Sequence, residues 1–260
     1  MSSTEEPILL EVDDDGVATV TLNRPDKLNI YNLRMRDGLI EALAALRVHP
    51  GARAVVLRAE GRHFSAGADL AEFGTAESIL DARRIRWERD PWVPLWTLPR
   101  PTVVALHGYA LGAGLEMALL CDVRLAAGDT VVGLPETRLG MLPSAGGTQS
   151  LPRAIAAAPA LPIVLTGERL DAQDALARGL VHRVVDDVEA EARRVAARLA
   201  RLPTGAVSAA KRALRAAGDL ALPAGLAEER RLAELVAAQP PGASAVQVSI
   251  IDDQGSSPVG

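Results

Sequence analysis

The chain has 260 residues and a formal net charge of −5, which is the length of one large domain, or of one domain with a small appendage. Hydrophobic residues make up 48% of it and charged residues 23%, which is enough for a core and excludes a disordered composition. The arginines are scattered rather than gathered in a basic stripe, so nothing in the charge pattern indicates nucleic-acid binding.

The start of the chain and its apolar stretches predict a soluble, cytoplasmic protein that does not cross a membrane. Residues 1–12 are acidic and contain neither the basic nor the apolar region of a secretory signal. The longest apolar stretch, 101–120, is interrupted by His107, by glycines and by Glu116, so it is unsuited to span a bilayer. Cys121 is the single cysteine, and a lone thiol suits a reducing compartment.

The first part of the chain predicts a hairpin, a helix and a buried strand. Apolar runs at 8–12 and 17–22 flank the turn "DDDG", which is typical of an antiparallel hairpin. Asn32 precedes apolar residues at helical spacing, so we expect it to cap a helix over 33–47. A buried strand is expected within 52–61, and the loop "RHFSAGADL" follows it.

Strand, small-residue loop and helix follow one another again in the middle of the chain. We expect a strand over 101–108, the loop "YALGAG" over 109–114 and a helix over 115–121. Two short strands and a glycine-rich turn are expected next, at 122–127, 130–136 and 144–149. This alternation predicts an α/β fold.

The C-terminal part predicts helices and then a tail. Three helical segments are expected, over 189–202, 205–218 and 223–238. The tail that follows is rich in Pro, Gly and Ser, although 245–251 is suited to pair as an edge strand. We therefore divide the chain into a core domain, 1–195, and a C-terminal helical region with a loose tail, 196–260.

Several familiar ligand-binding motifs do not fit this sequence. The third glycine of a dinucleotide-binding fingerprint would fall at Met117, and the lysine of a P-loop would fall at Gly114. The four histidines have no ligand-like spacing, so we expect no metal site. A serine hydrolase is an open alternative: Ser65 and Ser144 each stand in a partial G-x-S-x-G elbow that lacks its first glycine, and His182 is the candidate base.

Two loops of small residues, "FSAGADL" and "ALGAGLE", each follow a strand. Either loop alone is more typical of an ordinary tight turn. Two backbone N–H groups that converge on one oxygen would instead form an oxyanion hole. Glu116 follows the second loop among apolar residues, where burial penalises its charge. We expect Glu116 to face a reaction cavity; the alternative is an ion pair with a nearby arginine.

Six motifs, taken together and in this order, resemble the crotonase superfamily, the enoyl-CoA hydratase/isomerase family. The resemblance covers roughly residues 8 to 220. It implies a crotonase-like spiral of repeated ββα units with a C-terminal helical region, a homotrimer or a dimer of trimers, and an acyl-CoA substrate with no separate cofactor. The motifs are "NRPDKLN", "HFSAGADL", "GYALGAGLE", "CDVRLAA", "PETRLGMLPSAGGTQ" and "LTGERLDAQDALARGLVHRVV".

The resemblance also implies roles for particular residues. The N–H groups of Ala68 and Ala113 would bind the thioester oxygen, Glu116 would activate water, and Glu136 would donate a proton. Asp69 is expected to brace its own loop as well. The residues implied in binding the substrate, with the basic ones near the CoA phosphates, are Ala66, Gly67, Asp69, Leu70, Gly112, Arg24 and Lys27.

The presence of both glutamates favours an enoyl-CoA hydratase, which adds water across the α,β double bond of the thioester. An enoyl-CoA isomerase of the same family is an alternative, because moving a proton needs only one acid. A non-catalytic acyl-CoA-binding homologue is the other. Trp87, Trp92 and Trp96 lie in a region that lines the acyl pocket in this family, although ordinary packing explains them better.

Three features depart from the family pattern. Ala113 replaces a common glycine and still offers its N–H, Ser144 replaces another glycine, and the segment beyond about 220 does not resemble the usual closing helix. CoA contacts from that last segment are therefore not implied.

Overall fold

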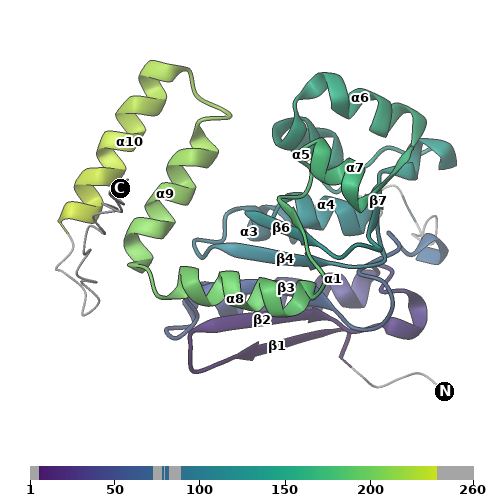
Figure 1. Cartoon of the computed structure of the whole chain (residues 1–260), viewed down its shortest axis with the longest axis horizontal. Helices are drawn as coiled ribbons and strands as arrows, with labels where there is room; N and C mark the ends of the chain where they lie inside the picture. Colours follow the sequence, from purple (N-terminus) through teal and green to yellow (C-terminus); the bar gives the residue numbers. More distant parts are fainter. Residues whose placement is uncertain (1–5, 73–77, 79, 82–88, 239–260) are drawn as a thin grey trace, which may run out of the picture.

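The computed structural model describes residues 6–72, 78, 80–81 and 89–238 (Figure 1). Within these residues one large sheet contains β1 (Ile8–Val12), β2 (Val17–Leu22), β3 (Ala54–Ala59), β4 (Thr102–Leu106), β6 (Val123–Ala126) and β9 (Arg183–Val184). A smaller sheet contains β5 (Tyr109–Leu111), β7 (Val131–Gly133) and β8 (Arg169–Asp171). The chain passes from β4 to β5, back to β6 and on to β7, so it alternates between the two sheets.

The predicted hairpin and buried strands are confirmed. β1 pairs antiparallel with β2, with Ile8 opposite Leu22. From β2 onward the large sheet is parallel, in the order β2-β3-β4-β6-β9. Parallel strands are covered on both faces by the elements that connect them, which explains their nearly continuous apolar sequences.

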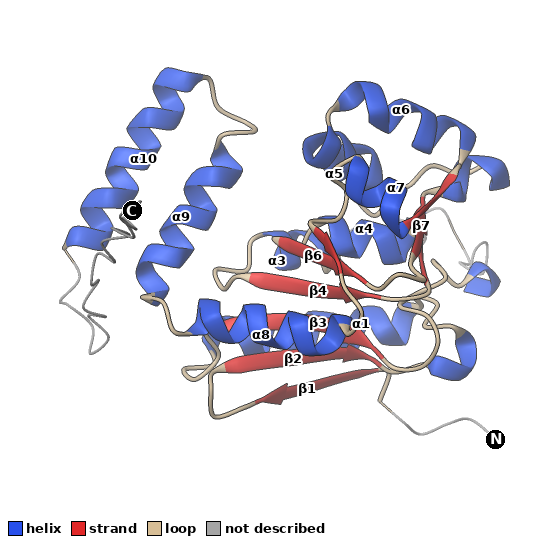
Figure 2. Ribbon diagram, in the orientation of Figure 1, coloured by secondary structure: helices blue, strands red, loops and turns tan. Residues whose placement is uncertain are grey.

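The helices cover both faces of the large sheet (Figure 2). Asn32 caps α1 as predicted, since its Oδ1 accepts the N–H of Met35 at 3.0 Å. One core packs α8 onto β2, β3, β4 and β6, and the other joins α1, α4 and the smaller sheet to the opposite face. The helices are α1 (Leu33–Val48), α3 (Trp92–Trp96), α4 (Ala113–Leu119), α5 (Gly147–Ile155), α6 (Ala157–Thr166), α7 (Ala172–Ala177), α8 (Val188–Ala200), α9 (Thr204–Ala216) and α10 (Leu222–Ala237). Short 3-10 helices are η1 (Pro25–Lys27), η2 (Leu70–Glu72) and η4 (Pro135–Leu139).

Two local predictions are corrected. Residues 109–111 were expected in a loop but form β5, because they pair with β7 and with Ser65; three residues are too few to show a strand pattern. The expected turn at 144–149 ends earlier, because α5 already begins at Gly147.

The three predicted C-terminal helices are present, and α9 and α10 form a hairpin that stands to one side of the molecule (Figure 1). Only Lys211 in α9 and Leu232 in α10 are buried. The division after residue 195 falls inside α8, which packs on the sheet as far as Ala200. Trp87 and the tail, including the suggested strand at 245–251, lie outside the described residues. No helix in the described part of the chain is both long and apolar enough to cross a membrane.

Candidate active site

The loop that contains Ala68 is held on both sides by backbone hydrogen bonds. The N–H of Tyr31 donates to Gly67 O and Tyr31 O accepts from the N–H of Asp69, both at 2.8 Å. On the other side Ser65 pairs with β5. Among the described residues no acceptor is recorded for the N–H of Ala68. The loop is therefore rigid and keeps one donor free.

The second small-residue loop begins α4. The N–H of Gly112 donates to Gly133 O at 2.9 Å, and α4 starts at the next residue, Ala113. The first N–H groups of a helix have no partner within it. The two loops touch, because a Cβ added to Gly112 would lie 3.6 Å from the Cα of Gly67. The N–H groups of Ala68 and Ala113 thus directly follow two glycines that are in contact.

Glu116 lies in α4 and is only 2% exposed. Its Oε1 accepts two backbone N–H groups, from Ala145 at 2.9 Å and from Gly147 at 2.7 Å. A Cβ at Gly147 would lie 2.8 Å from this oxygen, so the close approach requires glycine. In the described part of the chain no ion pair involves Glu116, which argues against the alternative of an arginine partner.

Glu136 lies in η4, whose first turn starts with Pro135. Its Oε2 is buried and has no hydrogen-bond partner among the described residues. Its Oε1 lies against Gly112, where an added Cβ would be 2.6 Å away. Gly112 also has φ of 51°, a region that favours glycine. A side chain at residue 112 would therefore displace the carboxyl group of Glu136.

The two carboxyl groups influence each other's protonation. Burial raises the pKa of Glu116 to about 7; the N–H groups of Gly147 and Ala145 oppose this effect, and the charge of Glu136 adds to it. Burial also raises the pKa of Glu136, against a bond to its own backbone N–H. Interacting acids titrate as a pair, so the charge state of one carboxyl group affects protonation of the other. Such a pair offers both a proton donor and a proton acceptor.

Comparisons with known proteins show the family of the chain. The sequence profile described as "Enoyl-CoA hydratase/isomerase" matches residues 13–241. The chain belongs to this family. The 2,3-dehydroadipyl-CoA hydratase of Escherichia coli (strain K12) is 42% identical over 227 residues, which cover 85% of this chain and 87% of the relative. The (E)-benzylidenesuccinyl-CoA hydratase of Thauera aromatica is 39% identical over 181 residues, which cover 69% and 70%.

Solved structures of enoyl-CoA hydratases have the same fold as this chain. The crystal structure of enoyl-CoA hydratase from Thermoplasma volcanium GSS1 matches with a TM-score of 0.84 and 30% identity, over 92% of this chain and 96% of that one. The one from Bacillus anthracis matches with a TM-score of 0.81 and 33% identity, over 90% and 92%. The prediction of a crotonase-like α/β fold is therefore confirmed.

Of the residues expected to bind CoA, Gly112 lies against the carboxyl group of Glu136, whereas Arg24, Asp69 and Leu70 lie at the Ala68 loop. Arg24 donates to Ile30 O at 2.7 Å, and its guanidinium lies 3.9 Å from the carboxylate of Asp69. Asp69 braces its loop as expected, since its Oδ1 accepts the N–H of Ala71 at 3.2 Å. Leu70 is 53% exposed. The side chains of Arg24 and Asp69 are mostly buried, with 21% and 16% exposed.

Two further members of the predicted set are connected through Leu28. The N–H of Ala66 donates to Leu28 O at 3.0 Å. Lys27, directly before Leu28, is exposed at the end of η1. The structure thus places Lys27 beside the Ala66 loop and does not bring it to the carboxyl groups.

Sequence reasoning missed Asn29, which joins these loops. Asn29 is fully buried with φ of 50°, and its Nδ2 donates to Glu60 O and His63 O at 2.8 and 2.9 Å. Its Oδ1 accepts the N–H of Arg24. Asparagine tolerates this left-handed conformation better than most residues, and that preference was the available signal. Sequence reasoning also missed the two N–H groups that donate to Glu116. The glycines of "SAGG" were the only indication of them.

The structure does not bring the serine-hydrolase candidates together. Ser65 is buried, and its hydroxyl donates to Asn29 O at 2.8 Å. Ser144 is exposed. The Nδ1 of His182 accepts the N–H of Arg124 at 3.0 Å, and burial lowers the pKa of the imidazole. The hydroxyl of Ser65 is thus bonded to the backbone instead of to a base.

The two described tryptophans, Trp92 and Trp96, have different neighbours. Trp92 packs against Tyr31, with ring centroids 5.0 Å apart, and Tyr31 is paired with the Ala68 loop. Trp96 instead lies under the guanidinium of Arg215, 3.9 Å from its ring centroid. Trp92 is therefore the described tryptophan that is connected to the site.

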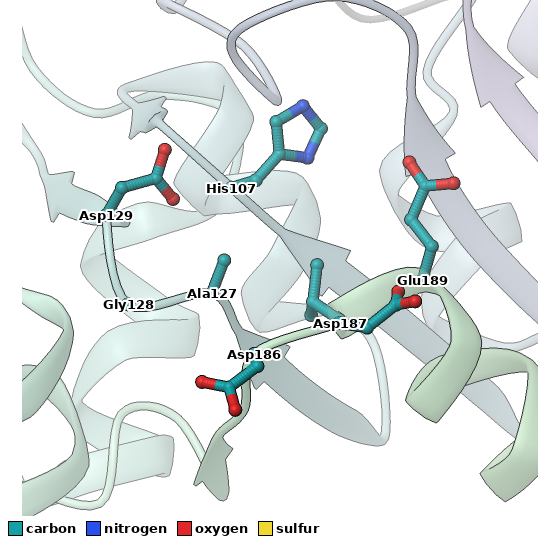
Figure 3. Close-up of a pocket in the computed structure, with 8 residues that line it drawn as sticks. His107, Ala127, Gly128, Asp129, Asp186, Asp187 and Glu189 are labelled. Atoms are coloured by element: carbon teal, nitrogen blue, oxygen red, sulfur yellow. The ribbon is translucent and has the colours of Figure 1, made fainter.

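A separate pocket of about 670 Å³ lies at the carboxyl ends of β4, β6 and β9 (Figure 3). Three of its acidic side chains have structural partners: Asp187 caps α8, Asp129 accepts the N–H of Gly108, and Glu189 pairs with Arg58. Within the described residues no group of three or more His, Cys, Asp or Glu could hold a metal ion. This pocket is lined by none of the predicted site residues.

Proposed function

We propose that this member of the family is an enoyl-CoA hydratase, which adds water across the α,β double bond of an enoyl-CoA thioester. One observation carries the proposal: Glu116 is buried and Glu136 partly buried, and neither has a cationic partner among the described residues. The carboxyl group of Glu136 lies against Gly112, directly before the N–H of Ala113, and Glu116 is one turn further along the same helix. The hydratase names of the Escherichia coli and Thauera aromatica relatives support it.

The oxyanion hole would stabilise the enolate that forms when water attacks. Negative charge develops on the thioester oxygen, and we assign its binding to the N–H groups of Ala68 and Ala113. Each preorganised donor of this kind contributes about 2.7–4 kcal/mol to catalysis in other enzymes. The rigid hydrogen bonding around Ala68 supports this role, since a fixed donor needs no reorganisation during the reaction.

The two glutamates would supply the proton transfers. The carboxylate of Glu116, held by two N–H groups, takes a proton from water while the water oxygen bonds to the β-carbon. The electron pair of the double bond moves to the α-carbon and oxygen, and protonated Glu136 delivers its proton to the α-carbon. The product is a 3-hydroxyacyl-CoA. Transfer of one proton from Glu116 to Glu136 restores the starting state.

We assign recognition of CoA to the Ala68 loop and its surroundings. Arg24 and Lys27 would lie near the CoA phosphates. The residues that would lie along the thioester and the rest of CoA are Ala66, Gly67, Asp69, Leu70 and Gly112. This chemistry draws on the thioester alone, so we propose no further cofactor and no metal. We also propose a cytoplasmic enzyme.

We propose assembly as a homotrimer or a dimer of trimers. The α9–α10 hairpin supports it, because this hairpin buries little of itself in its own chain while exposing large leucines, among them Leu214, Leu222 and Leu235. Mass photometry of the purified chain tests the assembly, and a monomer at micromolar concentration would contradict it.

A panel of enoyl-CoA thioesters that differ in length and branching tests the activity. We expect loss of the conjugated thioester absorbance and formation of 3-hydroxyacyl-CoA with at least one 2-enoyl-CoA. Turnover of 3-enoyl-CoA to 2-enoyl-CoA without hydration would establish the isomerase instead. Binding of acyl-CoA without any turnover would establish the non-catalytic homologue.

A further inference from the structure

Glu136 is carried by η4, a short 3-10 helix, and such helices have poor internal hydrogen-bond geometry. The residues that follow Glu136 bind a different element. The hydroxyl of Thr137 donates to Val164 O at 2.9 Å, and the Nε of Arg138 donates to Thr166 O at 2.6 Å. Both acceptors belong to the last turn of α6, whose carbonyl groups have no partner within that helix.

The backbone of η4 also packs on the turn that ends α6. Gly167 ends the helix with φ of 61°. A Cβ added there would lie 3.0 Å from the Cα of Pro135 and 3.0 Å from the Cγ of Arg138. Residues on both sides of Glu136 are therefore attached to the end of α6.

The carboxyl group of Glu136 has little support of its own. Its Oε2 has no partner among the described residues, its Oε1 rests against Gly112, and its bond to a backbone N–H is to that of Glu136 itself, in η4. Glu116 differs, because two N–H groups hold its Oε1 directly. The position of the Glu136 carboxyl must therefore come from the backbone of η4.

We propose that Thr137 and Arg138 are positioning residues for Glu136: by binding the carbonyl groups of Val164 and Thr166, they hold η4 so that the Glu136 carboxyl stays against Gly112. This inference rests on the proposed hydratase activity. Substrate is bound mainly by other loops, so a looser η4 affects the proton transfer and leaves binding unchanged. In enzymes a misplacement of about 1 Å can cost about 100-fold in rate.

The test compares Thr137→Val, which keeps the shape and removes the hydroxyl, with Thr137→Ser, which keeps the hydroxyl. Arg138→Met removes the second donor. We expect Thr137→Val and Arg138→Met each to lower kcat about 10-fold and the double variant about 100-fold, with KM within about 2-fold of the parent. Thr137→Ser should restore the parental kcat. Thr166→Val is the matched control, because it removes a hydroxyl that bonds to Pro162 O and to the N–H of Glu168, and it retains the carbonyl that binds Arg138.

A double-mutant cycle separates positioning from a merely structural role. If Thr137 acts through Glu136, then Thr137→Val should lower the residual rate of Glu136→Gln by less than 2-fold. If Thr137→Val lowers the rate of Glu136→Gln by the full 10-fold, the proposal is overturned. It is also overturned if the variant with both Thr137→Val and Arg138→Met has the parental kcat, or if Thr137→Ser is as slow as Thr137→Val. If the double variant fails to fold, the two Thr137 variants and the cycle decide. A parent that hydrates no enoyl-CoA overturns the proposed function as well, whereas an active parent with unaffected variants overturns this inference alone.

Discussion

The two ends of α4 bury carboxyl groups in opposite ways. Asp122, just beyond its C-terminal end, is 2.6 Å from the ammonium of Lys211 and 2.7 Å from the guanidinium of Arg215. Its Oδ2 also accepts the N–H and the hydroxyl of Thr102. Glu116, near the start of the same helix, has two backbone N–H groups and a second carboxyl group nearby, but no recorded cation among the described residues.

This difference indicates a structural role for the carboxylate of Asp122 and a catalytic role for that of Glu116. Cations and hydrogen bonds stabilise the charge of Asp122, which connects α9 to β4 and to the end of α4. Burial without cations raises the pKa of Glu116 towards neutral pH, where a group can both take and give a proton. Asp122 keeps 23% of its side chain exposed and has two cations, whereas Glu116 is 2% exposed and has none among the described residues. The first arrangement favours stability and the second favours reactivity.

The largest expected effect on the rate comes from changing the backbone at the N-terminal end of α4, near Glu116. Ala113→Pro removes the N–H that we assign to the oxyanion hole, while proline is well tolerated at the first position of a helix. We expect kcat to fall about 10²–10³-fold. Ala113→Gly keeps the N–H and should stay close to the parent. Steady-state hydration rates check this, and a folded proline variant with parental kcat would contradict the role of Ala113.

Asp122→Asn removes the carboxylate that forms the ion pairs at the C-terminal end of α4. It leaves Lys211, whose side chain is 8% exposed, without its carboxylate. We expect the free energy of unfolding to fall by about 3 kcal/mol, as for other buried ion pairs that lose one partner, with kcat nearly unchanged. Urea unfolding measures it.

Removing the ammonium as well, in Asp122→Asn with Lys211→Met, should recover part of that loss. Asp219→Asn is the control, because its pair with Arg153 is exposed and should matter by less than about 1 kcal/mol. Equal effects of Asp122→Asn and Asp219→Asn would remove the basis for the comparison.

The pH dependence of stability sharpens the contrast at Glu116. Its pKa is about 7 in the folded protein, against 4.5 ordinarily. Above pH 7 only the folded state carries a penalised charge, so Glu116→Gln should be more stable than the parent by about 1–3 kcal/mol. As the pH falls from 7 towards 5, the folded parent takes up a proton and this difference should shrink. Unfolding of both proteins at pH 5, 6, 7 and 8 measures it; a constant difference would contradict the raised pKa.

The smallest effects are expected at the two serines. Ser65→Ala removes two buried hydrogen bonds of the hydroxyl, to Asn29 O and from the N–H of Gly67, and should cost about 1–2 kcal/mol of stability, with a modest change in rate. Ser144→Ala changes an exposed side chain and should alter rate and stability least of all. A covalent adduct on either serine, seen by intact mass after mixing with substrate, would revive the hydrolase interpretation.

The sequence predicted those features that depend on local pattern. Apolar periodicity and the cap at Asn32 located α1, and the two glutamate motifs located the carboxyl groups. The helices α5 and α6 were not predicted, because Pro152 and Pro162 lie inside them and proline normally ends a helix. Tertiary packing tolerates both prolines here.

Contacts between distant segments could not be predicted. The N–H groups that hold Glu116 come from residues 145 and 147, and nothing local to Glu116 indicates them. The role of Asn29 depends on carbonyl groups of residues 60 and 63, which only the folded chain brings near. The ties from Thr137 and Arg138 to α6 are of the same kind.

The most direct test of the central claim is the hydration rate of Glu116→Gln and Glu136→Gln with the best 2-enoyl-CoA, followed by loss of the conjugated thioester absorbance. Each substitution keeps the shape of the side chain and removes its proton chemistry, so kcat should fall about 10²–10⁴-fold. The affinity for a saturated acyl-CoA should stay within about 2-fold, and neither variant should unfold more easily than the parent at pH 8. If both variants hydrate at the parental rate, the buried pair is not the catalytic centre and this account is wrong.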